Sequence, residues 1–90
     1  MEKFTIAERY TNENETPIQV GDKIKIVPVE EWKTQGVEFY DKSIEKYGSS
    51  FLKVEDIKHD NGVFFYTGST VNGVKVPIEF VDSDIEYVLR

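Results

Sequence analysis

Residues 51–80 constrain the fold most, because two Asn-Gly pairs, Asn61-Gly62 and Asn72-Gly73, each separate two runs that alternate apolar and polar residues. Asn and Gly tolerate the positive φ angles that both central residues of a mirrored two-residue turn require. Each pair therefore predicts a β-hairpin turn. We expect three consecutive antiparallel strands here, and hence a mainly β fold.

The first of these runs, residues 51–60, interrupts its own period of two. Leu52 and Val54 alternate with polar residues, but the next apolar residue is Ile57, so the alternation slips at Glu55-Asp56. An extra residue of this kind is typical of a β-bulge, which bends the strand as a small barrel requires. We predict a bulge at this position.

The next two runs predict strands at different positions in the sheet. In residues 63–67 both faces of the expected strand are largely apolar, which favours a central strand covered on both sides. In residues 74–80 apolar residues alternate with Lys75, Pro77 and Glu79. Pro77 has no N–H to donate to a ladder, so this run is expected at a sheet edge or at a corner.

The N-terminal part of the chain predicts two further strands with a loop between them. Alternation within residues 1–10 indicates an added N-terminal strand. Residues 11–17 are polar and end in proline, so they predict a surface loop. Gly21-Asp22 is expected to turn the chain into a second strand at residues 23–27.

Residues 34–47 change period, which predicts one short amphipathic helix inserted between strands. Its apolar residues fall at spacings of three or four: Val37, Tyr40, Ile44 and Tyr47. Thr34 suits the N-cap of this helix, and Gly48 suits its end. A shorter helix that begins after Asp41 is the alternative, because Gly36 weakens the first turn.

The C-terminal residues are acidic. The net charge is −6, from 11 basic and 17 acidic residues, and residues 79–90 hold one basic and four acidic residues. Residues 81–84 predict a single 3-10 turn, after which Ile85 and Val88 return to the core. Asp82, Asp84 and Glu86 do not have the spacing of a calcium loop. We interpret Asp82 and Asp84 as capping carboxylates. The acidic C-terminal residues form either a solvated face that favours solubility or an acidic surface that a partner can contact.

The order of short segments resembles small SH3-like barrel proteins encoded by bacteriophages and mobile elements. The segments that carry the resemblance are 20–26, Glu31-Trp32, Tyr47-Gly48, 51–57, 63–66 and 78–85. The resemblance covers residues 18–88, and residues 1–10 and 68–75 depart from it. It implies a single domain over residues 1–90, an SH3-like small barrel of five to six strands with one short helical insertion and a C-terminal 3-10 turn. The family brings no catalytic motif.

Several classes of function lack the residues that they need. The chain has no cysteine, which excludes disulfides and thiol chemistry. The one histidine, His59, lacks convergent partners and is interpreted as a surface residue. Motifs for a nucleophile elbow or a phosphate loop are missing. We expect a protein that is not an enzyme, without metal or cofactor. With neither a signal peptide nor a membrane span in view, we expect a cytoplasmic protein. The resemblance implies that this cytoplasm is that of a bacterial host cell.

Aromatic residues are the remaining functional signal, since twelve of them exceed what one small core can bury. Exposed Tyr and Trp often anchor protein contacts. The predicted partner-binding residues are aromatic or acidic: Trp32, Phe39, Glu38, Asp41, Asp82, Asp84 and Glu86. The alternative is that Trp32 is a lid on the barrel end and that the aromatics only cover its two openings.

These residues predict a non-catalytic protein-binding module with a basic protein partner. An inhibitor of a host nucleic-acid-handling or defence protein is the specific form that we expect. The negative net charge disfavours nucleic acid as a partner. The alternative is a nucleic-acid-associated SH3-like domain with a local lysine strip, which requires neighbouring strands to align four lysines on one face. They are Lys23, Lys25, Lys53 and Lys75.

Overall fold

The computed structural model describes residues 2–27, 51–70, 73 and 75–90. These residues form a mainly β structure, as predicted. Its elements are β1 (Lys3–Phe4), the 3-10 helix η1 (Ala7–Arg9), β2 (Lys23–Ile26), β3 (Phe51–Asp60), β4 (Val63–Thr70), the 3-10 helix η2 (Asp82–Asp84) and β5 (Ile85–Leu89). The helix predicted at 34–47 lies outside the described residues, as do Trp32, Phe39, Glu38 and Asp41.

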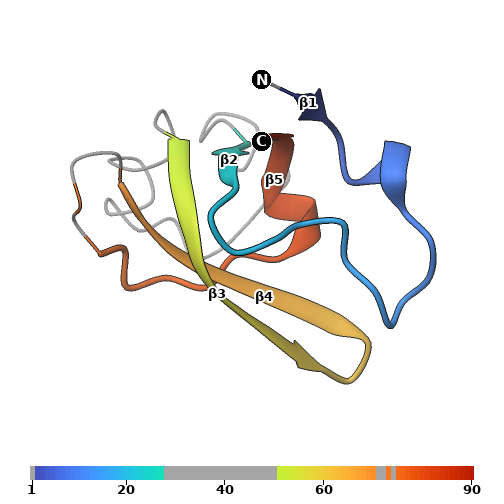
Figure 1. Ribbon diagram of the computed structural model, residues 1–90. Coiled ribbons are helices and arrows are strands. Elements are labelled where there is room, and N and C mark those ends of the chain that lie inside the picture. The colour runs from blue at the N-terminus through green and yellow to red at the C-terminus, as the bar shows by residue number, and fades with distance from the viewer. Residues whose placement is uncertain (1, 28–50, 71–72, 74) are drawn as a thin grey trace.

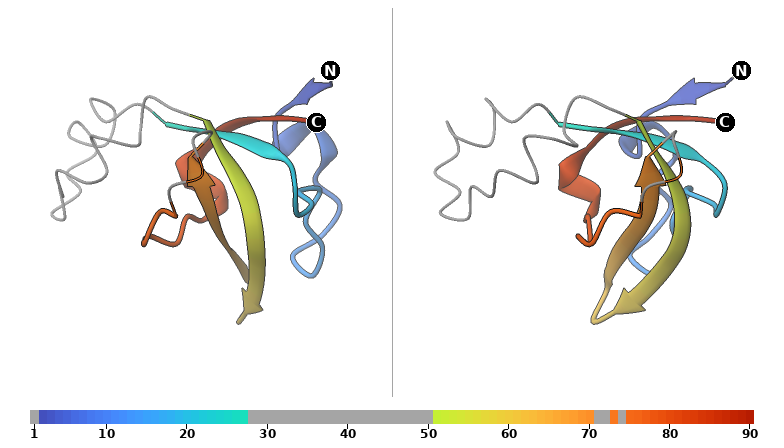
Figure 2. Two further views of the ribbon diagram at one scale, coloured as in Figure 1. Left: turned by 60° about the vertical axis from the view of Figure 1, so that its left-hand side comes forward. Right: turned by 90° about the vertical axis from the view of Figure 1, so that its left-hand side faces the viewer.

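All five strands belong to one antiparallel sheet in the order β1-β5-β2-β3-β4 (Figure 1). The last strand in the sequence, β5, lies between β1 and β2, so that Val88 pairs with both Phe4 and Ile24. Beyond β1, Glu2 and Arg90 exchange two backbone hydrogen bonds of 2.8 and 2.9 Å, and Figure 2 shows the two chain ends together. Over the described ranges the sheet is open, with β1 and β4 at its edges, so the closed barrel stays a prediction.

The β3–β4 hairpin confirms both local predictions made for it. Asp60 pairs with Val63 across Asn61-Gly62, and the φ angles of Asn61 and Gly62 are 50° and 78°. Two positive φ angles at the centre are what a mirrored turn requires. The register shifts between Val54 and Asp56, which is the predicted bulge. Beyond it the hairpin curves away from the other strands (Figure 1).

The turn at Asn72-Gly73 differs from its prediction. The N–H of Gly73 donates to the carbonyl of Thr70 at 2.9 Å, and Ser69 pairs with Lys75 across the turn. A two-residue turn centred on Asn72-Gly73 would instead pair Ser69 with Val76. Gly73, with a φ of 84°, is therefore the fourth residue of a turn that begins at Thr70. Glycine in this left-handed conformation is typical of a three-residue hairpin loop.

Over the described residues, strand β4 is the last strand of the sheet, so the prediction that it is central is wrong. Its first residue, Val63, is 42% exposed. Its outer edge is met by residues 75–80 at only two isolated bridges, Tyr66↔Phe80 and Ser69↔Lys75. The exposed Pro77 lies between these bridges and has no N–H for a continuous ladder. The prediction of an edge or corner for this run is confirmed.

The N-terminal strand is shorter than predicted, and the prediction is wrong beyond Phe4. Ile6 has helical backbone angles, with φ −60° and ψ −41°, and Arg9 donates its N–H to the Ile6 carbonyl at 3.1 Å. The hydroxyl of Thr5 accepts the N–H of Glu8 at 3.2 Å. This side-chain partner favours a turn over a further sheet ladder, so the chain leaves the sheet after β1. Residues 11–17 form a loop, as predicted.

The hydrophobic core lies on one face of the sheet. Its buried residues are Phe4, Ile18, Ile24, Ile26, Leu52, Val54, Tyr66, Val76, Phe80, Ile85 and Val88. In β2 the buried Ile24 and Ile26 alternate with Lys23 and Lys25. This period of two is typical of a strand with one face in the core. Complete burial of one such aliphatic side chain contributes about 1.5–3 kcal/mol.

A buried carboxylate ties the N-terminal loop to the end of the chain. Asp22 accepts the N–H of Gln19 at 2.8 Å and two hydrogen bonds from the Arg90 guanidinium, at 3.1 and 2.9 Å. Arg90 also donates to the carbonyl of Pro17 at 2.7 Å. Since an unpaired buried charge is costly, these bonds are needed for Asp22 to stay inside. The Asp22 bonds also raise the pKa of Arg90.

Gly68 provides a test of the bent hairpin. It pairs with Val54 at the bulge, and a Cβ added to Gly68 would lie 2.2 Å from the carbonyl oxygen of Lys53. Because a backbone atom cannot move away cheaply, we expect Gly68→Ala to lower the free energy of unfolding by about 3 kcal/mol, measured by urea denaturation. Gly21→Ala is the control, with a φ of 98° and no atom within 4 Å. Its free energy of unfolding should fall by only about 1–2 kcal/mol, the cost of placing an alanine at a positive φ angle. Equal losses would contradict the close approach.

Candidate binding site

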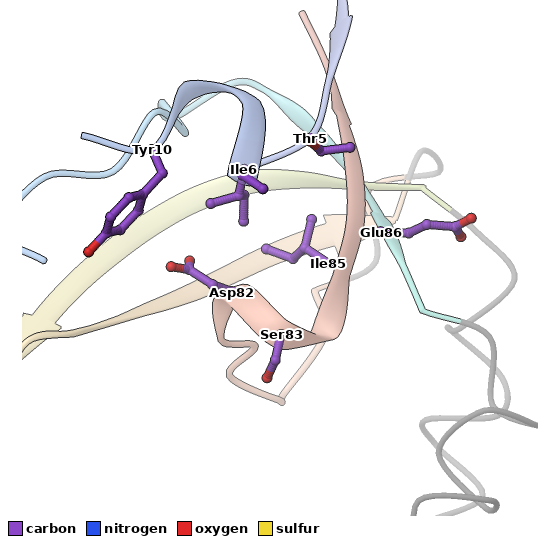
Figure 3. Close-up of a pocket in the computed structure, with 8 residues that line it drawn as sticks. Thr5, Ile6, Tyr10, Asp82, Ser83, Ile85 and Glu86 are labelled. Carbon is purple, nitrogen blue, oxygen red and sulfur yellow. The ribbon is translucent and has the colours of Figure 1, made fainter. Parts of the chain in front are cut away.

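A hollow of about 560 Å³ opens between the segment that follows β1 and the segment from η2 into β5 (Figure 3). We call it the N-terminal hollow. Its lining residues are Thr5, Ile6, Ala7, Tyr10, Asp82, Ser83, Ile85 and Glu86. The two segments are far apart in the sequence, and the pairing of β1 with β5 brings them together.

The floor of the N-terminal hollow is apolar. Ile6 packs on the core and points toward Ile85, which is buried (Figure 3). Tyr10 follows η1 at one side of the hollow and is 58% exposed. This floor exists because η1 turns residues 6–10 off the sheet and across the start of β5. An apolar floor beside an exposed tyrosine is typical of a contact surface.

Two carboxylates border this apolar floor. Figure 3 shows Asp82 turned toward the gap between Tyr10 and Ile85, whereas Glu86 points away at the other end. Both residues are exposed. Among the described residues that line the hollow, none is Lys or Arg. The N-terminal hollow therefore combines an apolar floor with a negative rim.

A hydrogen bond from the buried Tyr66 positions the Asp82 side chain. The Tyr66 hydroxyl lies 2.7 Å from Asp82 Oδ1 and 2.6 Å from the Thr16 hydroxyl. Because a carboxylate only accepts hydrogen bonds, Tyr66 donates to Asp82 and Thr16 donates to Tyr66. Burial, followed by the bond to Asp82, raises the pKa of Tyr66 above its ordinary value, so the phenol keeps its proton. Asp82 is thus held in one orientation before any partner arrives.

Of the predicted acidic residues that the structure describes, Asp84 does not join Asp82 and Glu86 at the hollow. Asp84 is half-buried, accepts the N–H of Val81 at 3.1 Å and returns its own N–H to the Val81 carbonyl at 2.9 Å. It closes the η2 turn and lies outside the N-terminal hollow, so its capping role is confirmed. Asp82 instead accepts the Tyr66 hydroxyl, so the capping interpretation is wrong for Asp82. Asp82 and Glu86 line the hollow.

Sequence reasoning missed the N-terminal wall of the hollow. Residues 5–10 read as a strand, although Thr5 and Glu8 have the Thr-x-x-Glu spacing that marks the start of a helical turn. This local signal was sufficient to predict η1, and with it the exposure of Tyr10. The four lysines of the alternative prediction lie elsewhere, on the outer face of the sheet or against its edge.

Comparison with protein-family models, with curated proteins and with solved structures finds no significant match for this chain. In the part of the chain that the structure describes, no three acidic or histidine side chains gather as a metal site would require. Over the same ranges, no helix has the length and apolar character needed to cross a membrane.

Asp84 gives the fold a predictable response to pH. Burial raises its pKa above the ordinary value of 3.8, although the Val81 hydrogen bond opposes this effect. The stabilisation that comes from a protonated Asp84 is therefore complete below the ordinary pKa and is lost as the pH rises through the higher folded value. Asp84→Asn keeps an acceptor for Val81 and carries no charge. We expect its stability relative to the wild type to rise between about pH 3 and about pH 7, measured by urea denaturation. A constant difference across this range would contradict the assignment.

Proposed function

We propose that this protein is a non-catalytic binding module whose N-terminal hollow receives an apolar segment with a basic side chain from a protein partner. The observation that carries the proposal is the exposed Tyr10 beside the apolar floor, with Asp82 and Glu86 at the rim. A tyrosine offers a large contact area at a low cost in side-chain entropy. The carboxylates favour a lysine or arginine of the partner and disfavour an acidic one.

The bond from Tyr66 to Asp82 strengthens this proposal. A carboxylate that already has its bound orientation loses little freedom when a cation arrives, so less of the interaction energy is spent on ordering. Because Asp82 is exposed, the incoming cation would keep part of its hydration. We therefore expect the charges to fix the orientation of the partner and the apolar floor to supply most of the affinity.

We further propose that the open sheet belongs to an SH3-like small barrel of the type that bacteriophages and mobile elements encode, acting in the cytoplasm of a bacterial host. The bulged hairpin and the 3-10 turn directly before the last strand support this assignment. An inhibitor of a nucleic-acid-handling or defence protein fits the negative rim, because proteins that bind nucleic acid present basic surfaces.

The test is affinity capture from bacterial lysate with three immobilised proteins: wild type, Tyr10→Ala and Val20→Ala. Val20 is 64% exposed and lies outside the hollow, so its variant is the matched control. A true partner should be retained by wild type and by Val20→Ala, and lost from Tyr10→Ala. With the purified partner, calorimetry should show Tyr10→Ala weakening binding by about 2 kcal/mol, or about 30-fold.

The charge contribution is tested separately with Glu86→Gln, because Glu86 is exposed and lines the hollow. This variant should slow association with a basic partner, and the difference from wild type should shrink as salt is added. If every captured protein binds Tyr10→Ala as tightly as wild type, the hollow is not the binding site.

A further inference from the structure

A continuous row of residues crosses the outer face of the sheet. The cross-strand pairs are Lys3↔Leu89, Leu89↔Lys23, Lys23↔Lys53, Lys53↔Ser69 and Ser69↔Lys75. Residues that pair directly in antiparallel strands project from the same face. Four lysines are thus aligned over all five strands and the segment beside β4. Three of these lysines, Lys23, Lys53 and Lys75, belong to the four that the alternative prediction required on one face.

A second row of outward-facing residues lies two residues further along the strands and contributes two aromatic rings. Lys25 of β2 pairs with Tyr87 on one side and with Phe51 on the other. The rings of Phe51 and Tyr87 meet edge to face, with centroids 5.9 Å apart. The ammonium of Lys3 lies 4.3 Å from the Tyr87 ring centre, and that of Lys25 lies 5.6 Å from the Phe51 ring centre. We call the two rows together the lysine–aromatic face.

Positive charge is concentrated on this face although the chain as a whole carries −6. Of the described lysines, only Lys58 lies outside it, where it pairs with Glu79. Lys23 and Lys53 are directly opposed, and like charges in this position destabilise a sheet. Glu55 is nearby and accepts the Ser69 hydroxyl at 2.6 Å, but among the described residues it forms no ion pair with either lysine. A destabilising arrangement of this kind is explained if an anion binds there.

We propose that the lysine–aromatic face binds single-stranded nucleic acid. Lysines attract phosphates, and exposed bases stack on aromatic rings, so a surface that interleaves both suits a single strand. From Lys3 to Lys53 the row spans three strand spacings, about 14 Å, and the two rows are about 7 Å apart. Phe51 and Tyr87 are half-buried, which leaves part of each ring open to a base. A duplex hides its bases, so it would meet only the lysines.

The first measurement is fluorescence anisotropy of a labelled oligothymidine of about 12 nucleotides, titrated with the intact chain at low and moderate salt. Oligouridine of equal length distinguishes RNA from DNA as the preferred strand. Binding should weaken with salt, with a log–log slope of about −2 to −3, because three or four lysines each release about 0.7 counterion. Absent binding at low salt would overturn the proposal.

Two pairs of variants separate the charges from the rings. Lys23→Gln should lower affinity about threefold to tenfold and reduce the salt slope by about 0.7, whereas Lys58→Gln makes the same charge change off the face and should alter neither. Lys23→Gln also removes the repulsion from Lys53, so a loss of folding is not expected. Tyr87→Leu should lower affinity roughly tenfold without changing the slope.

Competition experiments test whether the face prefers single-stranded nucleic acid to other anions. Unlabelled polyglutamate and a duplex of equal length should both displace the labelled strand poorly. Strong displacement by polyglutamate, together with unchanged binding by Tyr87→Leu, would show a site for acidic protein segments and overturn the proposal. Tighter binding of the duplex would do the same. Tyr10→Ala should bind the strand like wild type, because the N-terminal hollow has no residue in common with this face.

Discussion

The structure depends on the burial of one tyrosine, Tyr66. Its ring has no exposed surface, and its backbone exchanges hydrogen bonds of 2.7 and 2.8 Å with Phe80. A buried hydroxyl needs partners, and here they come from Thr16 in the N-terminal loop and from Asp82 in η2. Tyr66 of β4 therefore connects the N-terminal loop, the segment of residues 75–80 and the η2 turn before β5. The hydrogen bond from the buried Tyr66 to Asp82 therefore fixes η2, which forms one wall of the N-terminal hollow, to the core.

Both proposed surfaces arise where the regular sheet is interrupted or is left uncovered. The N-terminal hollow exists because Thr5 diverts the chain out of β1. The lysine–aromatic face exists because β2 alternates between the core and the outside, while β5, beyond its register shift, pairs Tyr87 and Leu89 with the outward lysines of β2. One surface is apolar with a negative rim, and the other is positive with aromatic rings. A small domain with an acidic composition can therefore present opposite charges to two partners, because the charges are segregated by strand register rather than mixed.

The features that sequence reasoning predicted are those with a local cause. Asn61-Gly62 determines its turn through its own φ angles, and the slip at Glu55-Asp56 marks the bulge, so both were predictable. The position of β5 between β1 and β2 depends on pairing between distant segments, which no local pattern encodes. The same holds for the alignment of Lys23 with Lys53, since register decides it. Tyr10 was assigned to a strand because the alternation in residues 4–10 outweighed the turn signal at Thr5.

The sheet order also determines when the molecule can fold. The β3–β4 hairpin joins neighbours in the sequence and can form within microseconds, without the rest of the chain. Among the described strands, in contrast, β1 pairs only with β5, and β5 is the last of these strands to be synthesised. During translation the N-terminal strand therefore waits without a hydrogen-bonding neighbour until residues 85–89 have left the ribosome. Completion of the sheet therefore requires closure of the long loop between β1 and β5, which is slower than closure of the β3–β4 hairpin.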